Sequence, residues 1–471
     1  MFKFSLKVMS KEKRKYISFA ITMLILTTVE FIFFELVNHQ LITGMPATER
    51  ISMSILSLMI ITFSFFITFY VNSQYIDYKR KELGLLYLCG RNLLDISKYL
   101  LLQYLVIFII VIPIGFILGA LILPVLYSFI ANQYDIGMNI FQYNLTGLIE
   151  TMIFVLTKIG YIIIINIGFT YRNEIIEIIN HTDKKKNKQM MDIVKYGGGA
   201  SIKMSFASLG MIGMDPKARQ ETLTKSINET IEERKLKQES ETGKKPLLIT
   251  LVSVIAYFVT LVLMIMNDFT SGNFALYCYI NSFALAMIVS FAIPYFIGKA
   301  HGGFMNKSPV RFVVLNDLQL MLKDSLVPLV MIVAVLPSVV SIISFSLGEN
   351  LYRMVALIGY VVLEIILAGC LYFKNVVYIH SRESEFKSLS VMGYNQDLIK
   401  KIINREVIYH FLIASVLPLI SIAVQIYKSY VFGGLSTIIM AIMIISYIVI
   451  FMIAFALTLI VFRKEYTGRE S

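Results

Sequence analysis

Charged residues and cysteines are scarce in this sequence, and each shortage excludes a class of protein. Charged residues make up 16% of the 471 residues, whereas a soluble globular domain is about one-quarter charged. The three cysteines are scattered and show neither the CxxC nor the Cys/His spacing of a zinc site or a disulfide framework. We therefore expect neither a soluble domain nor a metal site, and we interpret the cysteines as small buried hydrophobic residues.

Motifs of catalysis are also missing. The five histidines are isolated, and the chain contains no HExxH and no GxSxG. The segment closest to a Walker A loop, at 197–203, lacks the second glycine before its lysine and follows no predicted strand. We expect no catalytic residue and no bound cofactor in this chain.

Apolar residues dominate the sequence, at 57% of the chain and a mean hydropathy of +0.72. They form blocks long enough to cross a hydrocarbon core of about 30 Å. A backbone in lipid must satisfy its hydrogen bonds internally, and a β-barrel would show short alternating segments, so the pattern predicts an all-α polytopic membrane protein. The ten predicted transmembrane spans are 16–37, 52–77, 99–127, 148–170, 247–267, 274–298, 326–348, 355–378, 407–427 and 436–462.

The distribution of basic residues predicts the orientation of these spans. With the N-terminus inside, the inner segments hold 38 of the 43 Lys and Arg residues, and the outer loops hold only Arg50, Arg353 and Lys428. This asymmetry obeys the positive-inside rule. We expect a multi-pass protein of the bacterial cytoplasmic membrane with both termini cytoplasmic. Its net charge of +12 then faces anionic lipid headgroups rather than nucleic acid.

The two halves of the chain repeat each other. At a shift of 303 residues, 75–90 falls on 378–393, and at a shift of 312 residues Leu6, Met9 and Lys11 fall on Leu318, Met321 and Lys323. The parallel order implies a pseudo-twofold axis along the membrane normal. The predicted domains are a first repeat at 1–179 (a leading amphipathic helix and spans one to four), a cytoplasmic linker at 180–246, inserted spans five and six at 247–298, and a second repeat at 299–471 (a leading helix and spans seven to ten).

Each repeated segment is a cytoplasmic loop with a basic cluster at the membrane exit. Glu82 and Glu385 are expected to open a short amphipathic helix, where a carboxylate suits the positive end of the helix dipole. Gly90 and Gly393 are expected to end it as C-cap glycines. An ordinary interfacial helix would have the same pattern, but its duplication at matched positions favours a surface that a partner recognises.

These loops resemble the signature loop of FtsX-like (MacB-type, type VII) ABC transporter permeases. The ten-span arrangement resembles the BceB-type branch of that family, which is associated with resistance to antimicrobial peptides and with lantibiotic immunity. The branch has a large extracellular domain between spans seven and eight, whereas here a few residues connect Leu347 to Arg353. The family often has a Glu entering the span after each loop; Glu406 fits that pattern and Gln103 departs from it.

The resemblance implies a membrane subunit whose energy comes from a separate cytoplasmic ATPase dimer that binds ATP and Mg²⁺. The function it implies is resistance to, or export of, an antimicrobial peptide or lipid-linked antibiotic by mechanotransmission. A sensor histidine kinase is a further candidate partner. The residues expected to couple to the ATPase are Arg80, Glu82, Leu85, Leu86, Gly90, Arg382, Glu385, Leu389, Gly393 and Glu406.

Three ionisable residues, Glu30, Lys158 and Glu364, fall at similar depths within predicted spans. A lone charge there costs at least about 2.5–3.5 kcal/mol, so pairing inside the bundle is expected. The set is either a polar cluster that contacts a cationic substrate or an interhelical salt bridge that locks the bundle, and the second interpretation is favoured. Lys374, nearer a span end, is expected to snorkel to the inner surface.

Three features leave alternatives open. The GxxxG at 115–119 suits either dimerisation or internal packing. The segment 180–246 is either a solvated helical linker or a docking element. For function, the rivals are a regulatory subunit of a sensing or cell-wall complex, and an ion-coupled secondary transporter that uses Glu30, Lys158 and Glu364 as a relay.

Overall fold

The structure of the protein is a computed structural model. It describes residues 5, 7–9, 13–40, 44, 47–91, 93–134, 139–172, 245–267, 272–304, 309–345, 350–381, 396–432 and 435–467. By its internal contacts the chain divides into one unit of 1–172 with 250–471 and a second unit of 173–249. The predicted linker and the Walker-like segment therefore lie almost entirely outside the described residues.

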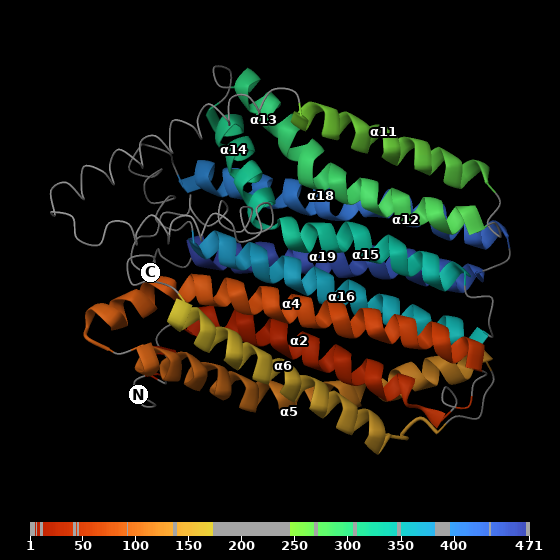
Figure 1. Cartoon of the computed structure of the whole chain (residues 1–471), viewed down its shortest axis with the longest axis horizontal. Coiled ribbons are helices and arrows are strands. Elements are labelled where there is room, and N and C mark those ends of the chain that lie inside the picture. The colour runs from red at the N-terminus through yellow and green to blue at the C-terminus, as the bar shows by residue number, and fades with distance from the viewer. Residues whose placement is uncertain are drawn as a thin grey trace, which may run out of the picture. The chain divides into compact units, whose positions relative to one another are not determined.

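The described part is built from helices, which confirms the predicted all-α polytopic fold. Ten of the helical stretches in that part are long and apolar enough to cross a membrane, and each overlaps one predicted span. The helices in Figure 1 are α2 (Lys13–Val37), α4 (Ala47–Leu88), α5 (Leu93–Tyr134), α6 (Leu145–Arg172), α11 (Lys245–Met266), α12 (Gly272–Met287), the π-helix η1 (Ile288–Ala292), α13 (Ile293–Phe304), α14 (Pro309–Asp324), α15 (Leu326–Phe345), α16 (Asn350–Ser381), α18 (Gln396–Val431) and α19 (Thr437–Thr467).

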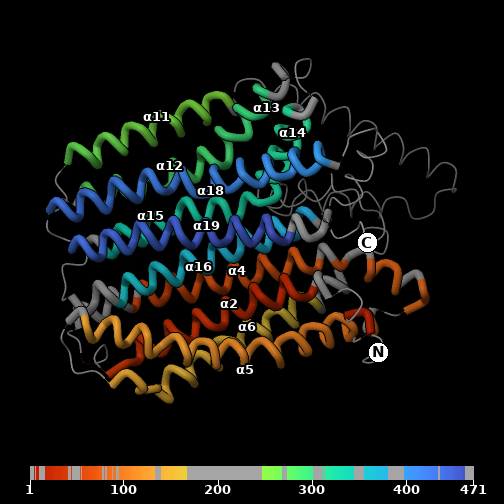
Figure 2. The backbone as a smooth tube through the Cα atoms, turned by 180° about the vertical axis from the view of Figure 1, so that it is seen from behind, coloured from red at the N-terminus to blue at the C-terminus, as the bar shows by residue number. Residues whose placement is uncertain are grey.

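The membrane helices lie side by side (Figures 1 and 2), and the spans of α2, α15 and α16 are the most buried of them. α16 packs against α2 and α4, so the two halves of the chain meet along these three helices. Peripheral helices instead present apolar side chains outward: Ile109, Leu121 and Val125 of α5 are each about two-thirds exposed. Such a surface suits lipid, because hydrocarbon does not penalise apolar exposure.

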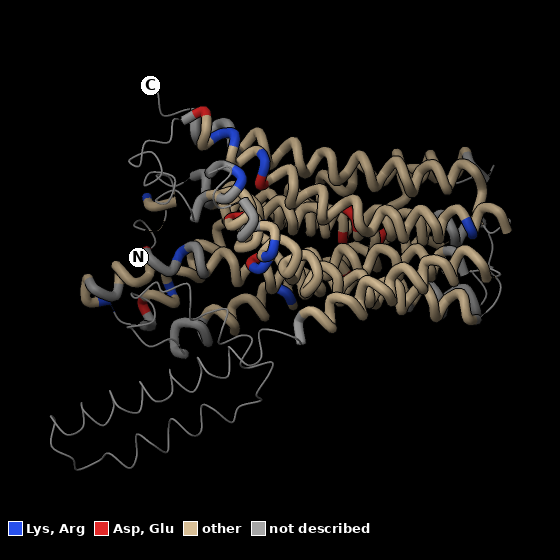
Figure 3. Tube along the Cα trace, turned by 90° about the horizontal axis from the view of Figure 1, so that it is seen from above, with Lys and Arg blue, Asp and Glu red and all other residues tan. Residues whose placement is uncertain are grey.

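Most of the described Lys and Arg residues gather at one end of the bundle (Figure 3). We call this the basic end; Lys79 near the end of α4 and Lys98 near the start of α5 belong to it. The clustering is the three-dimensional counterpart of the charge asymmetry in the sequence. That the basic end faces the cytoplasm stays a prediction from the positive-inside rule.

The GxxxG of α5 serves internal packing. A Cβ atom added at Gly115 would lie 3.1 Å from the Thr27 side chain, and one added at Gly119 would lie 2.5 Å from the Phe31 ring. Thr27 and Phe31 both belong to α2, so the two glycines let α5 approach α2 closely. Of the two interpretations, internal packing accounts for both glycines.

Span six contains a π-turn that the sequence analysis missed. Between α12 and α13, the Ile293 N–H donates to the Ile288 carbonyl, five residues back. Pro294 follows directly; it has no N–H to donate, and its ring would clash with the carbonyl four residues back. The wider turn accommodates the proline without breaking the span.

Substituting Gly119→Val should destabilise the protein by about 1–3 kcal/mol, because the new side chain overpacks the α2–α5 contact. Gly160→Val in α6 is the matched control: nothing lies within 4 Å of a Cβ at that position, while the change in helix propensity is the same. Thermal unfolding of the purified protein in detergent measures the difference. Equal midpoints for the two variants would contradict the packing role of Gly119.

Candidate functional site

The first predicted coupling loop is a helical hairpin at the basic end. α4 continues without a break from its apolar span, Leu56–Ile76, to Leu88, and α5 begins at Leu93. The prediction that Glu82 opens a separate short helix is therefore wrong. No proline separates the span from the loop segment, so the helix simply runs on beyond the apolar region.

The hairpin has a small core of its own, which holds its two arms together. Leu86 packs against this core, whereas the neighbouring Leu85 is 64% exposed near the turn. The tip thus presents an apolar side chain on a rigid support, which is a suitable contact for a partner protein. The four buried core residues are Leu83, Ile96, Tyr99 and Leu100.

Glu82 lies inside the hairpin instead of at a helix N-terminus. Its carboxylate forms a salt bridge with Lys79 and accepts a hydrogen bond from the Tyr99 hydroxyl. Lys79 is buried and donates to the Tyr16 hydroxyl of α2 at 2.5 Å, with its Nζ 4.2 Å from the centre of the Tyr16 ring. Glu82 therefore positions the hairpin by linking α4 to α5 and, through Lys79, to α2.

Gly90 ends α4 as the sequence predicts. Its φ of +79° lies in the left-handed region, which costs glycine little. The Arg91 N–H donates to the Leu86 carbonyl at 3.2 Å, and the Cys89 N–H donates to the Leu85 carbonyl at 3.0 Å. The first of these bonds is the one that defines a Schellman C-cap.

Most of the second predicted loop lies outside the described residues. Arg382, Glu385, Leu389 and Gly393 belong there, as does the side chain of Arg80 in the first loop. The two span-entering positions are described: Glu406 of α18 and Gln103 of α5 are both buried. The Tyr75 hydroxyl donates to Gln103 Oε1 at 3.4 Å, so Gln103 joins α4 to α5 within the first half.

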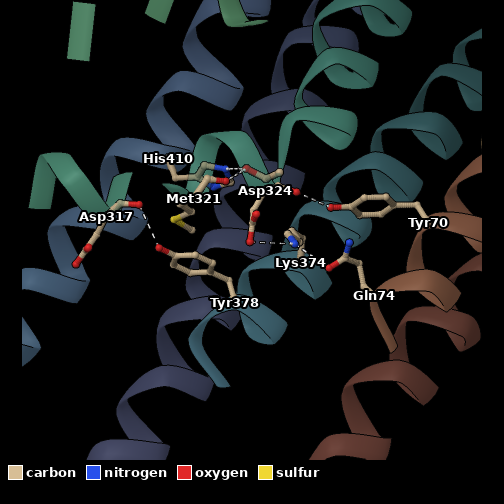
Figure 4. A network of polar contacts seen from close by, with 9 residues as sticks. Tyr70, Gln74, Asp317, Met321, Asp324, Lys374, Tyr378 and His410 are labelled. Carbon is tan, nitrogen blue, oxygen red and sulfur yellow. Dashed lines mark hydrogen bonds and ion pairs between the residues drawn. The ribbon is translucent and has the colours of Figure 1, made fainter. Parts of the chain in front are cut away.

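A polar network surrounds the elbow between α14 and α15, and the sequence analysis did not predict it (Figure 4). The Tyr70 hydroxyl of α4 donates to the Asp324 carbonyl at 3.3 Å. At the next residue, the Ser325 hydroxyl lies 2.6 Å from Nε2 of His410 in α18. Helices from both halves of the chain thus contact adjacent residues of the elbow, α4 at Asp324 and α18 at Ser325.

Lys374 of α16 completes this network and corrects a prediction. It does not snorkel to the surface: the residue is 5% exposed, and its Nζ donates to Gln74 Oε1 at 2.7 Å. The same Nζ lies 3.8 Å from an Asp324 carboxylate oxygen, and nearby the Tyr378 hydroxyl of α16 donates to the Asp317 carbonyl at 3.1 Å. Lys374 therefore ties α4, α14 and α16 together.

Glu30 and Lys158 form a salt bridge inside the first half. Both residues are buried, and the Ser64 hydroxyl also donates to the Glu30 carboxylate. The contact joins α2, α4 and α6, which supports the interpretation as a structural lock. Glu364 of α16 does not belong to it, so the described part of the chain does not assemble the three residues into a relay.

At the end opposite the basic end, Glu35 of α2 caps the start of α6. Its carboxylate accepts the Asn144 N–H at 2.9 Å, and Gly147 lies against it. A carboxylate at a helix N-terminus meets unsatisfied N–H groups and the positive end of the dipole. Asn144 is itself the N-cap, with its Oδ1 accepting the Thr146 N–H at 3.4 Å. Asn144 and Thr146 thus both take part in the N-terminal cap of α6. Burial lowers the pKa of the His39 imidazole, which lies just beyond the end of α2.

The chemistry available to these sites is binding and mechanical coupling. Within the described ranges, no three His, Cys, Asp or Glu side chains lie close enough together to hold a metal ion. The hairpin offers an apolar tip, and the hydrogen bonds at the elbow join helices from the two halves of the chain.

Removing one member of the Glu30–Lys158 pair should leave a buried charge without its partner. We expect Lys158→Met to lower the free energy of unfolding by about 3–5 kcal/mol. Adding Glu30→Gln to that variant should restore a large part of the loss, since neither charge then remains. Thermal unfolding in detergent measures both, and a double variant no more stable than the single one would contradict the pairing.

The comparisons with known proteins agree with this arrangement. Residues 54–171 match the family model described as FtsX-like permease C-terminal. The match covers most of α4, all of α5 and nearly all of α6, including the hairpin. No curated protein matches the chain. The chain is therefore a multi-pass membrane protein that carries an FtsX-like permease domain at 54–171, a domain found in the membrane subunits of ABC transporters.

Proposed function

We propose that this chain is the permease subunit of an ABC transporter of the BceB type. It protects the cell against, or exports, an antimicrobial peptide or a lipid-linked antibiotic by mechanotransmission. The observation that carries the proposal is the hairpin, whose apolar tip at Leu85 is rigidly joined to the membrane helices through the Glu82, Lys79 and Tyr16 contacts.

The proposed partner is a separate ATPase, in two copies, bound at the basic end. ATP and Mg²⁺ belong to that partner, and this chain itself catalyses no reaction. The basic end faces the cytoplasm of a bacterial cell, where its Lys and Arg residues also meet anionic headgroups.

The route of the motion follows the contacts of α4. The hairpin tip and the span belong to one continuous helix, so a force on the tip reaches the span directly. From there, Tyr70 and Gln74 of α4 pass it to the α14–α15 elbow and to Lys374 of α16. This route connects the first half of the chain to the second at the depth where α15 begins.

Binding of the ATPase should depend on the hairpin tip. Leu85→Ala should weaken capture of the ATPase by the tagged permease in mild detergent about tenfold, the effect of losing a contact worth about 1.4 kcal/mol. The fold should be unaffected, because the side chain is exposed. Leu145→Ala is the matched control: Leu145 is 72% exposed at the other end of the bundle. Equal capture by both variants would refute tip docking.

Protection should depend on the elbow network without any change in ATPase binding. In cells that carry the permease and its ATPase, Lys374→Met should lower the tolerated concentration of a cationic peptide antibiotic severalfold. The same variant should still capture the ATPase normally. Lys428→Met, which removes a lysine bonded to the Asn267 carbonyl far from the basic end, should keep protection. Full protection by Lys374→Met would exclude the proposed route.

A further inference from the structure

One face of α16 carries polar side chains deep inside the bundle. Tyr360, Glu364 and Asn375 are each fully buried, and their spacing places them on the same side of the helix. Within the described ranges, the Tyr360 hydroxyl, both carboxylate oxygens of Glu364 and both amide atoms of Asn375 lack a hydrogen-bond partner. Buried polar atoms are rarely left in this state, so this face calls for a functional explanation.

Glu364 is the member of this set that can change its charge. The two described lysines that are buried within the spans have partners other than Glu364: Lys158 binds Glu30, and Lys374 binds Gln74 and approaches Asp324. An ionised carboxylate without a cation is costly in an apolar interior, whereas the neutral acid is tolerated far more easily. The packing seen here is therefore the packing of a protonated Glu364.

The surroundings of Glu364 suit an acid that gains and loses a proton. The hydroxyls of Tyr360 and of Ser446 in α19 lie near the carboxyl, and the Ser446 hydroxyl donates to the Met443 carbonyl at 3.2 Å. Tyr447, the next residue of α19, donates its hydroxyl proton to the Ser415 carbonyl at 2.8 Å.

We propose that Glu364 is a proton-binding site at the contact between α16 and α19. The neutral acid allows the two helices to pack closely, and release of the proton to water loosens that contact. Once ionised, the Glu364 carboxylate needs a hydrogen bond from water or from a protein donor. The neighbouring hydroxyls of Tyr360 and Ser446 can donate that bond only if the helices move. This site lies midway along α16 and is independent of ATPase docking, which is proposed for the hairpin.

The test compares the pH dependence of stability for the full-length protein in detergent. A carboxyl that is buried as the neutral acid in the fold but ionises in the unfolded chain stabilises the fold at low pH, and this contribution is lost as the pH rises. The thermal midpoint of the wild type should therefore fall as the pH rises above the ordinary carboxyl range of about 4–4.5. Glu364→Gln, a neutral isostere of the acid, should lack that fall. Parallel profiles for the two proteins would overturn the proposal.

Glu30→Gln is the control, because Glu30 is the charged partner of Lys158. It should be less stable than the wild type around neutral pH, whereas Glu364→Gln should match or exceed the wild type there. A loss of stability in Glu364→Gln as large as that in Glu30→Gln would show that Glu364 is a paired carboxylate and would overturn the proposal.

Infrared spectroscopy of the wild type provides a second test that does not require Glu364→Gln to fold. The carbonyl band of a protonated carboxyl should be present at neutral pH and should decrease as the pH is raised. Glu364→Asp should shift that band. A wild-type spectrum without a protonated carboxyl at neutral pH, or with one that Glu364→Asp leaves unchanged, would refute proton binding at Glu364.

Discussion

Hydrocarbon offers no hydrogen-bonding partner, and the internal contacts of this protein follow from that constraint. Each polar group inside the bundle must find a partner on another helix or remain neutral. Glu30 and Lys158 meet this demand by pairing, and Asn72 of α4 does so by donating to Asn166 of α6 at 3.0 Å. The first half of the chain is therefore fastened by polar contacts that leave little freedom between α2, α4 and α6.

In the described part of the second half, the buried polar atoms without a hydrogen-bond partner are concentrated on α16. At a shift of 303 residues, Asn72 corresponds to Asn375. Asn72 is bonded, whereas Asn375 has no partner within the described part of the chain. α16 is also the helix that contacts both α2 and α4 across the junction of the halves. The helix that contacts both α2 and α4 is thus also the one on which buried polar atoms without a hydrogen-bond partner are concentrated.

Features governed by local sequence could be predicted, and features governed by helix register could not. The apolar blocks are long enough to locate every span, and Gly90 marks the end of α4 because a left-handed residue there favours glycine. The start of the loop helix was misplaced at Glu82, because the amphipathic pattern beyond the membrane does not reveal whether the helix is interrupted. Lys374 was misplaced for a different reason: its partners Gln74 and Asp324 are distant in sequence. A local sequence pattern does not predict contacts between residues so far apart in the chain.

The unbroken course of α4 has a geometric consequence. At 1.5 Å per residue, its 42 residues make a rod about 63 Å long. If the contact of Gln74 with Lys374 serves as the fulcrum, about 21 Å of the rod lie on the side of the hairpin tip and about 40 Å on the other side. A small sideways push at the tip then swings the far end about twice as far in the opposite direction. The protein would act as a lever that amplifies displacement while reducing force, which suits parting lipids around a bound molecule better than pulling against a strong load.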